Sequence, residues 1–183
     1  MRVVFGSDHA GYELKQILID HVRAMGHEVL DVGTDSTAAV DYPDFAEALG
    51  MAIISKEADR GILVCGSGVG ASVSVNKIPG IRAAVCHDCY SAHQGVEHDD
   101  MNVLVLGARI VASSLAQDLV WMFLGAEFSK EERHLRRVAK ITKLVNYDRL
   151  CFLFYTRPSL SYFLTGTHSN KTIIILINCS LHC

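Results

Sequence analysis

The residues best suited to chemistry lie in one short run, Cys65 to Gly70, which reads Cys-Gly-Ser-Gly-Val-Gly. Its glycines let backbone N–H groups approach an anion, and a helix that begins there adds partial positive charge. A thiol beside a helix N-terminus is expected to ionise more easily than usual. A glycine run alone is also compatible with a tight turn that binds nothing, and a lone cysteine with a small core residue. The spacing is not that of a dinucleotide site.

A pair of arginines is the second candidate. Arg133 and Arg137 are four residues apart in a pattern typical of a helix, so they lie on one face of it. Two guanidinium groups placed in this way can hold a phosphate between them. Glu131 and Glu132 are close by, which leaves open the alternative of a solvated charged face.

Two other clusters could be taken for metal or redox sites. His98, Asp99 and Asp100 are consecutive, so they cannot converge on one ion without distant partners. Cys86 and Cys89 form a single C-x-x-C pair, with no second pair at zinc-finger spacing. We therefore expect neither a metal nor a redox centre.

The elements that must position these residues alternate between strands and helices. Short β-branched runs predict strands at 3–6, 28–32, 61–65, 82–86 and 102–106, and helical periodicity follows them. Asp8 is placed to cap the first helix, and Pro43 suits the first turn of the second. Repeated strand-then-helix order predicts an α/β fold, a doubly wound (Rossmann-like) five-stranded parallel sheet with helices on both faces.

Ligands of such a sheet bind where its strands end. Asp8 and His9 follow the first strand, Cys65 ends the third, and further polar candidates at these ends are His87, Asp88 and Arg109.

The composition limits the possible partners and the compartment. The chain has 17 Lys and Arg against 20 Asp and Glu, a net charge of −3, which gives no basic surface for nucleic acid or an anionic membrane. Its six cysteines come without a secretory start, so we expect a cytoplasmic protein with free thiols.

The character of the chain changes near Asp148. Residues 149–183 contain no Asp or Glu, hold three of the six cysteines and show no sustained period. We therefore divide the chain into a catalytic domain, 1–148, and an atypical C-terminal tail, 149–183, that is not part of it. An extra hairpin is the alternative.

Several scattered segments match one family in the family's own order. The chain resembles ribose-5-phosphate isomerase B and the related galactose-6-phosphate isomerase subunits, over about residues 1–147, and 96–106 is most similar to eukaryotic, plant-type members. The matching segments are 6–11, 41–43, 65–70, 76–77, 80–83, 90–92, His98 with 102–104, 107–109, and Arg133-His134 with Arg137.

The resemblance implies an aldose–ketose isomerase of pentose phosphate metabolism, without metal or organic cofactor. It implies that Cys65 is the base, that His98 opens the sugar ring, and that Ser67 bonds the enediolate. The amides of Gly66, Gly68, Val69 and Gly70 would form the anion hole. Asp8 would hold substrate hydroxyls, Tyr42 would lie against the sugar, and the phosphate would be bound by His9, Arg109, Arg133 and Arg137.

Asp99 departs from many bacterial members, which have Asn directly after the ring-opening histidine. An amide can donate a hydrogen bond to a developing oxyanion, whereas an ionised carboxylate repels it. We expect Asp99 to affect which sugar phosphate is preferred.

The resemblance also implies a homodimer, or a dimer of such dimers, whose active sites are shared between two copies. Cys65 and His98 occur in one chain here, which favours a self-sufficient homo-oligomer. Two alternatives stay open: an isomerase of a six-carbon sugar phosphate, and a non-catalytic sugar-phosphate sensor on the same fold.

Overall fold

The computed structural model describes residues 1–155, 164–168 and 171–175, with side chains up to residue 144. The chain divides into two compact units, Met1–Val145 and Asn146–Cys183, which are described separately.

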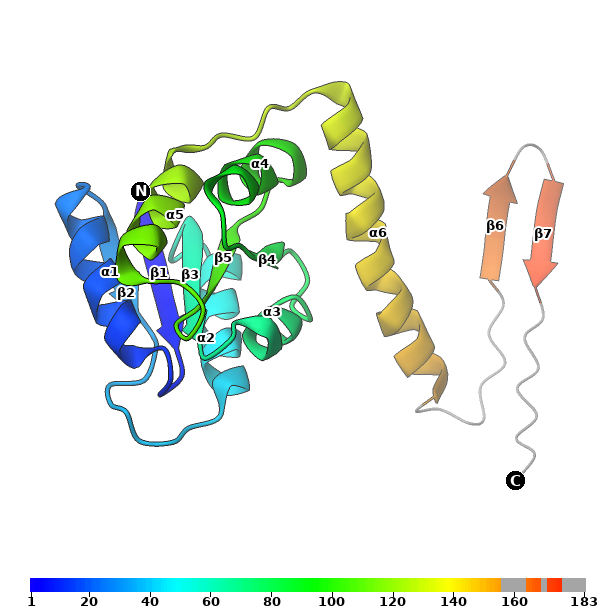
Figure 1. Ribbon diagram of the computed structural model, residues 1–183. Coiled ribbons are helices and arrows are strands. Elements are labelled where there is room, and N and C mark those ends of the chain that lie inside the picture. Colours follow the sequence, from blue (N-terminus) through cyan, green and yellow to red (C-terminus); the bar gives the residue numbers. More distant parts are fainter. Residues whose placement is uncertain (156–163, 169–170, 176–183) are drawn as a thin grey trace. The chain divides into compact units, whose positions relative to one another are not determined.

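A five-stranded parallel sheet forms the centre of the first unit, as predicted (Figure 1). Its order is β2-β1-β3-β5-β4. The strands are β1 (Arg2–Ser7), β2 (Glu28–Asp31), β3 (Arg60–Cys65), β4 (Ala83–Val85) and β5 (Val103–Gly107). β1, β3 and β5 lie side by side in the middle, so the residues that follow them meet at one edge of the sheet.

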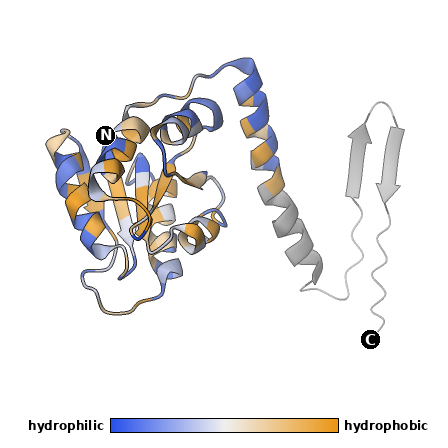
Figure 2. Cartoon of the chain, viewed as in Figure 1, coloured by the Kyte–Doolittle hydropathy of each residue, from blue (hydrophilic) through white to orange (hydrophobic). Residues whose placement is uncertain are grey.

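Helices cover both faces of this sheet. They are α1 (Tyr12–Ala24), α2 (Tyr42–Ile54), α3 (Val69–Val75), α4 (Cys89–Asp99) and α5 (Ser113–Gly125). Alternate strand residues point to opposite faces: Phe5 and Ile62 pack with α1, α4 and α5, whereas Val4 and Leu63 pack with α2 and α3. Figure 2 shows the strands between these helices as predominantly hydrophobic. The predicted doubly wound fold is confirmed.

The start of α1 differs from the prediction. Its N-cap residue is Gly11, and no side chain caps it. Asp8 lies before the helix instead, where its Oδ1 accepts a hydrogen bond from the Gly11 N–H at 3.0 Å. The prediction of Asp8 as the cap is therefore wrong, and its other carboxylate oxygen is left for another partner. Pro43 does lie in the first turn of α2, as predicted.

The last helix crosses the boundary that the sequence predicted. α6 runs from Glu132 to Tyr155, whereas the two compact units meet between Val145 and Asn146. The second unit contains an antiparallel pair, β6 (Leu164–His168) with β7 (Lys171–Ile175), which agrees with the alternative of a hairpin. Within the described part of the chain, no helix is both long and apolar enough to span a membrane.

Candidate active site

Cys65 is the last residue of β3 and meets Asp8, the first residue after β1. Its Sγ lies 3.0 Å from Oδ2 of Asp8, and both side chains are almost fully buried. The contact is possible because β1 and β3 are direct neighbours in register, so their ends coincide. Two candidates that are 57 residues apart in the sequence thus form one hydrogen-bonded pair.

The ionisation of Cys65 is opposite to the prediction from the glycine turn. Burial raises the pKa of the thiol above its usual value, and the hydrogen bond to Asp8 and the charge of that carboxylate raise it further. Backbone N–H groups of Gly66 and Gly68 bond the sulfur and lower the pKa, but they do not compensate. The expectation of an easily ionised thiol is wrong because the sulfur is buried and, in addition, faces a carboxylate.

The turn after Cys65 is held in place by the loop that follows β5. The Ala108 N–H donates to the Cys65 carbonyl at 2.8 Å, and the Arg109 N–H donates to the Gly66 carbonyl at 3.0 Å. A Cβ at Gly107 would lie 2.7 Å from the Ser67 carbonyl oxygen, which shows how closely the two segments approach. The guanidinium carbon of Arg109 lies 3.5 Å from where a Cβ of Gly66 would be, so this side chain borders the turn.

Glycine is required at two further places around the thiol. Gly68 has φ +82°, a left-handed conformation that other residues rarely adopt, and it caps α3. A Cβ at Gly11 would lie 2.3 Å from the Val64 carbonyl oxygen. The start of α1 can therefore pack against the end of β3 only because residue 11 has no side chain.

Tyr42 and His9 lie near the same strand ends, where ligands of such a sheet bind. The Tyr42 ring covers Gly70, since its Cζ lies 2.7 Å from where a Cβ would be placed there. Nδ1 of His9 accepts a hydrogen bond from the Val40 N–H at 3.2 Å, which ties it to the loop before α2. Ser67 and Val69 are exposed at the mouth of the turn.

A second group of candidates surrounds the end of α4. Nδ1 of His98 lies 2.7 Å from the Gln94 amide nitrogen, and its ring packs on that of His134 with centroids 4.1 Å apart. Asp99 is the last residue of α4 and is half-buried. The sequence pattern predicts no role for His134 or for Gln94, although Gln94 is spaced four residues from His98 on a helix.

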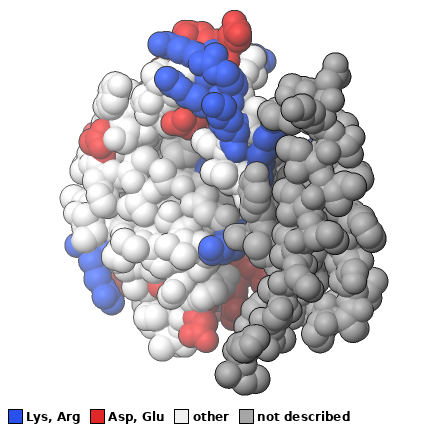
Figure 3. Space-filling view, turned by 90° about the vertical axis from the view of Figure 1, so that its right-hand side faces the viewer, with Lys and Arg blue, Asp and Glu red and all other residues white. Residues whose placement is uncertain are grey.

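Arg133 and Arg137 are exposed on the first turns of α6. Nε of Arg133 lies 2.8 Å from a Glu131 carboxylate oxygen, the contact expected of a solvated charged face. In Figure 3, Lys and Arg side chains gather where α6 begins, with Asp and Glu side chains beside them.

The two groups lie at opposite ends of the strands, one at the amino ends and the other at the carboxyl ends. α4 returns the chain to the amino end of β5, where Arg82 and Asn102 bond each other through backbone and side-chain groups. Cys65 is paired with the carboxyl end of the same strand. Five residues of strand separate the two ends by about 16 Å. Among the described residues, no hydrogen bond or ion pair joins His98 to Cys65 or Asp8.

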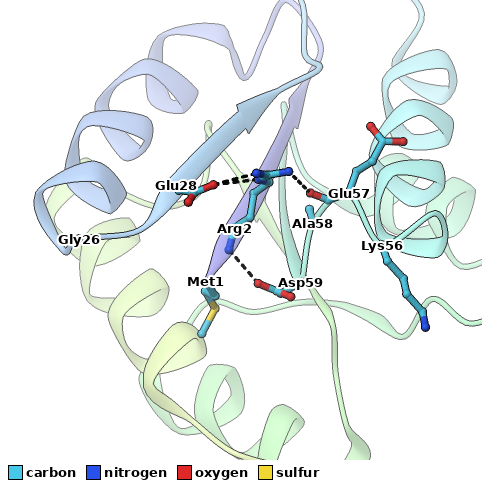
Figure 4. A pocket seen from close by; sticks show the side chains of 8 residues that line it. All are labelled: Met1, Arg2, Gly26, Glu28, Lys56, Glu57, Ala58 and Asp59. Carbon is cyan, nitrogen blue, oxygen red and sulfur yellow. Dashed lines mark hydrogen bonds and ion pairs between the residues drawn. The ribbon is translucent and has the colours of Figure 1, made fainter.

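A cavity of about 330 Å³ lies away from both groups (Figure 4). It opens at the amino ends of β1 and β2, and none of the predicted site residues lines it. Arg2 bonds Glu28 there at 3.0 Å, and its N–H bonds Asp59 at 2.8 Å. Its charged groups largely satisfy one another, so we do not assign the site to it.

The remaining strand-end candidates have structural roles or none. Asp88 caps α4, since its carboxylate accepts the Ser91 N–H at 2.8 Å, so it is not free to serve as a ligand. Burial raises the pKa of Cys86 to about 11, which leaves it a thiol. Within residues 1–155 and the hairpin strands, no three His, Cys, Asp or Glu side chains are grouped to hold a metal ion.

Comparison with known proteins gives a consistent result over the first unit. The family model described as Ribose/Galactose Isomerase matches residues 3–141. Ribose-5-phosphate isomerase B of Escherichia coli is 43% identical over 143 residues, which cover 78% of this chain and 95% of that protein. D-erythrulose-4-phosphate isomerase of Pectobacterium atrosepticum is 39% identical over 70% of this chain and 85% of its own. The solved structure of ribose-5-phosphate isomerase B from Clostridium thermocellum is 47% identical, with a TM-score of 0.79, and covers 80% of this chain and 99% of that one.

Proposed function

The chain belongs to the ribose/galactose isomerase family, and from this premise we propose that it interconverts ribose 5-phosphate and ribulose 5-phosphate. One observation carries the mechanism: a buried thiol, Cys65, lies at the mouth of a glycine turn and 3.0 Å from the Asp8 carboxylate. A base next to backbone N–H donors suits proton abstraction beside a carbonyl, because the same site stabilises the oxyanion that forms.

The reaction begins with a closed sugar. Nε2 of His98 takes the proton of the C1 hydroxyl while the bond from C1 to the ring oxygen breaks, and it returns that proton to the ring oxygen. The product is the open aldehyde, with the same atoms and charge as the ring.

The Cys65 thiolate then takes the proton from C2 of the aldehyde. The C–H electrons form the double bond between C1 and C2, and the carbonyl electrons move to O1, which gives the enediolate. The O2 proton passes to O1 while Cys65 returns its proton to C1, and the ketose results. Ser67 and the backbone N–H groups of 66–70 stabilise the intermediate.

Cys65 must first lose its own proton. The sulfur is a donor to Asp8 in the resting site, and its raised pKa keeps it a thiol near neutral pH. We assign Asp8 two tasks: it holds substrate hydroxyls, and it is the nearest acceptor for the thiol proton. Proton transfer from sulfur to Oδ2 leaves a neutral carboxyl group beside the thiolate, which avoids two adjacent negative charges.

The phosphate end is bound at a distance from the reacting carbons. Arg109 and His9 border the Cys65 crevice of their own chain, whereas Arg133 and Arg137 lie on α6. Binding energy from this remote phosphate can position C1 and C2 against the thiol.

A complete site requires two copies of the chain. His98 lies at the amino ends of the strands of its own sheet, about a strand length from Cys65, so one copy cannot bring both to one small sugar. The surfaces around both groups carry exposed apolar side chains: Val69 (60%) and Val73 (58%) on α3, and Leu135 (49%) and Leu144 (64%) on α6. We propose a two-fold homodimer, able to pair further into a dimer of dimers, in which His98, Arg133 and Arg137 of one copy complete the Cys65 crevice of the other.

Asp99 would lie beside His98 in that shared site. Its charge next to a developing oxyanion is unfavourable, so we propose that it adjusts the choice among sugar phosphates rather than the chemistry. The six-carbon alternative therefore belongs in the same assay. A non-catalytic sensor would need neither Cys65 nor His98. We place the enzyme in the cytoplasm.

The test is a coupled assay of purified protein against aldose phosphates of four, five and six carbons. Cys65→Ala should lower turnover on the preferred sugar by about 10² to 10⁴-fold, the usual contribution of a general base, while binding persists. Cys89→Ala is the matched control, since it removes a half-buried thiol on α4 outside the crevice. Near-normal turnover of Cys65→Ala would show that another group is the base.

A further inference from the structure

His134 is a buried histidine that the proposed reaction does not use. Its side chain is only 1% exposed, and its Nε2 has no hydrogen-bond partner among the described residues. Nδ1 lies 2.7 Å from the Ser129 hydroxyl oxygen, and the ring centroid lies 4.1 Å from that of His98, with the planes 31° apart. A polar ring buried with one nitrogen unsatisfied costs stability, so a neutral packing role explains it poorly.

The backbone fixes His134 to the same turn that carries His98. The Ser129 N–H donates to the Glu97 carbonyl at 3.0 Å, which ties the segment before α6 to the last turn of α4. The His134 N–H donates to the Glu131 carbonyl at 2.9 Å. The Ser129 hydroxyl then contacts Nδ1 of the imidazole at 2.7 Å, which gives the ring a preferred orientation.

His98 is held from two sides as a result. Gln94, one turn earlier on α4, contacts Nδ1, and the His134 ring covers one face of the imidazole. The side chain remains 28% exposed, and among the described residues Nε2 has no hydrogen bond and one weak ion pair, with a Glu97 carboxylate oxygen at 3.9 Å. The nitrogen that is left for substrate therefore has a fixed direction.

We propose that His134 is a positioning residue for ring opening. Its imidazole, hydrogen-bonded to Ser129, packs against the His98 ring and keeps Nε2 of His98 directed outward to the sugar of the neighbouring copy. This inference rests on the proposed function, in which His98 opens the ring. A base that must take and return a proton within one step needs a fixed orientation, because small displacements cost large factors in rate.

The surroundings of the two histidines favour the neutral form of His134. Burial, the neighbouring His98 and the guanidinium groups of Arg133 and Arg137 all lower the pKa of His134, and only Glu131 opposes them. Glu97 faces His98 from α4. Two stacked imidazoles cannot both carry a proton easily, so an uncharged His134 leaves His98 free to take up the C1 hydroxyl proton during ring opening.

The two sugars of the reaction separate ring opening from proton transfer. Ribose 5-phosphate closes a five-membered ring through its C4 hydroxyl. Ribulose 5-phosphate cannot, because its carbonyl is at C2 and the oxygen that would reach it carries the phosphate. Enediolate formation from ribulose 5-phosphate therefore requires Cys65 but no ring-opening step. In D₂O it is followed by NMR, as the loss of C1 protons together with the appearance of product.

The decisive variant is His134→Asn, which retains a polar group near Ser129 and removes the ring. We expect turnover of ribose 5-phosphate to fall about tenfold to hundredfold with KM nearly unchanged, part of the usual general-base contribution. Enediolate formation from ribulose 5-phosphate should stay within about twofold of the native value. His134→Phe restores a flat ring and should recover most of the loss.

His21→Asn is the matched control, because His21 also has a buried Nε2 without a hydrogen-bond partner among the described residues but lies on α1, outside the site. It should change neither sugar's rate. If His134→Phe does not fold, Ser129→Ala replaces it, since it releases the same ring and should give a smaller loss limited to ribose 5-phosphate. Equal losses with both sugars, or no loss with either, would overturn the positioning role. Persistent enediolate formation in Cys65→Ala would instead contradict the proposed function. The comparison of the His134 variants on the two sugars would still decide the positioning role.

Discussion

The two halves of the candidate site are built in different ways. Around Cys65, the geometry is made by backbone: strands in register, a left-handed glycine, and helix and loop segments that approach so closely that a Cβ could not fit. Around His98, it is made by side chains, through Gln94, His134 and Ser129. The first half depends on the fold as a whole, and the second on individual residues, so substitutions should affect them differently.

The largest expected effect is loss and recovery of activity between the two halves. Cys65→Ala and His98→Ala should each be nearly inactive, because general-base help is worth about 10² to 10⁴-fold. Mixed under conditions that exchange subunits, they should regain activity. Each hybrid dimer has one of its two sites intact, so each hybrid should have up to about half of the native activity by symmetry.

Subunit exchange in that mixture is verified separately, for example by native mass spectrometry of differently tagged copies. A mixture that exchanges and stays inactive would place the whole site within one chain.

The next effect breaks the backbone half. Gly11→Ala would place a Cβ 2.3 Å from the Val64 carbonyl oxygen, and neither backbone can move without disturbing the end of β3. We expect the free energy of unfolding to fall by about 3 kcal/mol, the upper part of the usual range for overpacking. Denaturant titration measures it.

Gly125→Ala is the control for that measurement, because nothing lies within 4 Å of a Cβ there. It should leave the free energy of unfolding within about 0.5 kcal/mol, as exposed substitutions usually do. Equal midpoints for the two alanine variants would show that the contact at residue 11 is not tight.

A smaller effect is expected from the arginines of α6. Arg137→Ala should raise KM for the sugar phosphate about tenfold, by loss of a charge-assisted bond of roughly 1.5 kcal/mol. Arg136→Ala, which removes an equally exposed arginine from another face of α6, should leave KM unchanged. Steady-state kinetics decide between a phosphate clamp and a solvated face; similar KM values in both variants and the native enzyme favour the latter.

The smallest effect is a shift in pH dependence. Because the Asp8 carboxylate bonds the neutral thiol and repels the thiolate, it raises the pKa of Cys65. Asp8→Asn removes the repelling charge but also the acceptor of the thiol proton, which must then be lost to solvent, so the rise of kcat/KM with pH should move to higher pH. The pH–rate profile measures this, even where the loss of hydroxyl contacts lowers the whole curve. A profile that moves toward lower pH, or not at all, would contradict the role of Asp8 as proton acceptor.

The difference between the halves also explains what could be predicted from the sequence. Periodic runs defined the five strands, and the rule that ligands bind where parallel strands end selected Asp8, Cys65 and Arg109, which the structure places around one turn. The expectation that His98 and Cys65 act from different copies came from the family resemblance and not from this rule.

The errors concern properties that arise only on packing. Asp8 has the residue type of a cap and the position of one, but β3 places the Cys65 sulfur beside it. Burial and the same contact together raise the pKa of the thiol, because a local rule about helix ends includes neither the packing around the sulfur nor a carboxylate from another strand. His134 was given no role for a similar reason: its neighbours Arg133 and Arg137 carry the obvious chemistry, and its contact with His98 crosses 36 residues of sequence.

Cys65 and His98 lie at opposite ends of the strands, and this has a kinetic consequence for the proposed dimer. An isolated copy would be folded yet inert, so the quantity that catalyses is the pair, whose abundance follows mass action. Below the dissociation constant of the dimer, activity would rise with the square of protein concentration, and specific activity would fall on dilution. Catalysis would thus report how much of the protein has assembled, with no effector required.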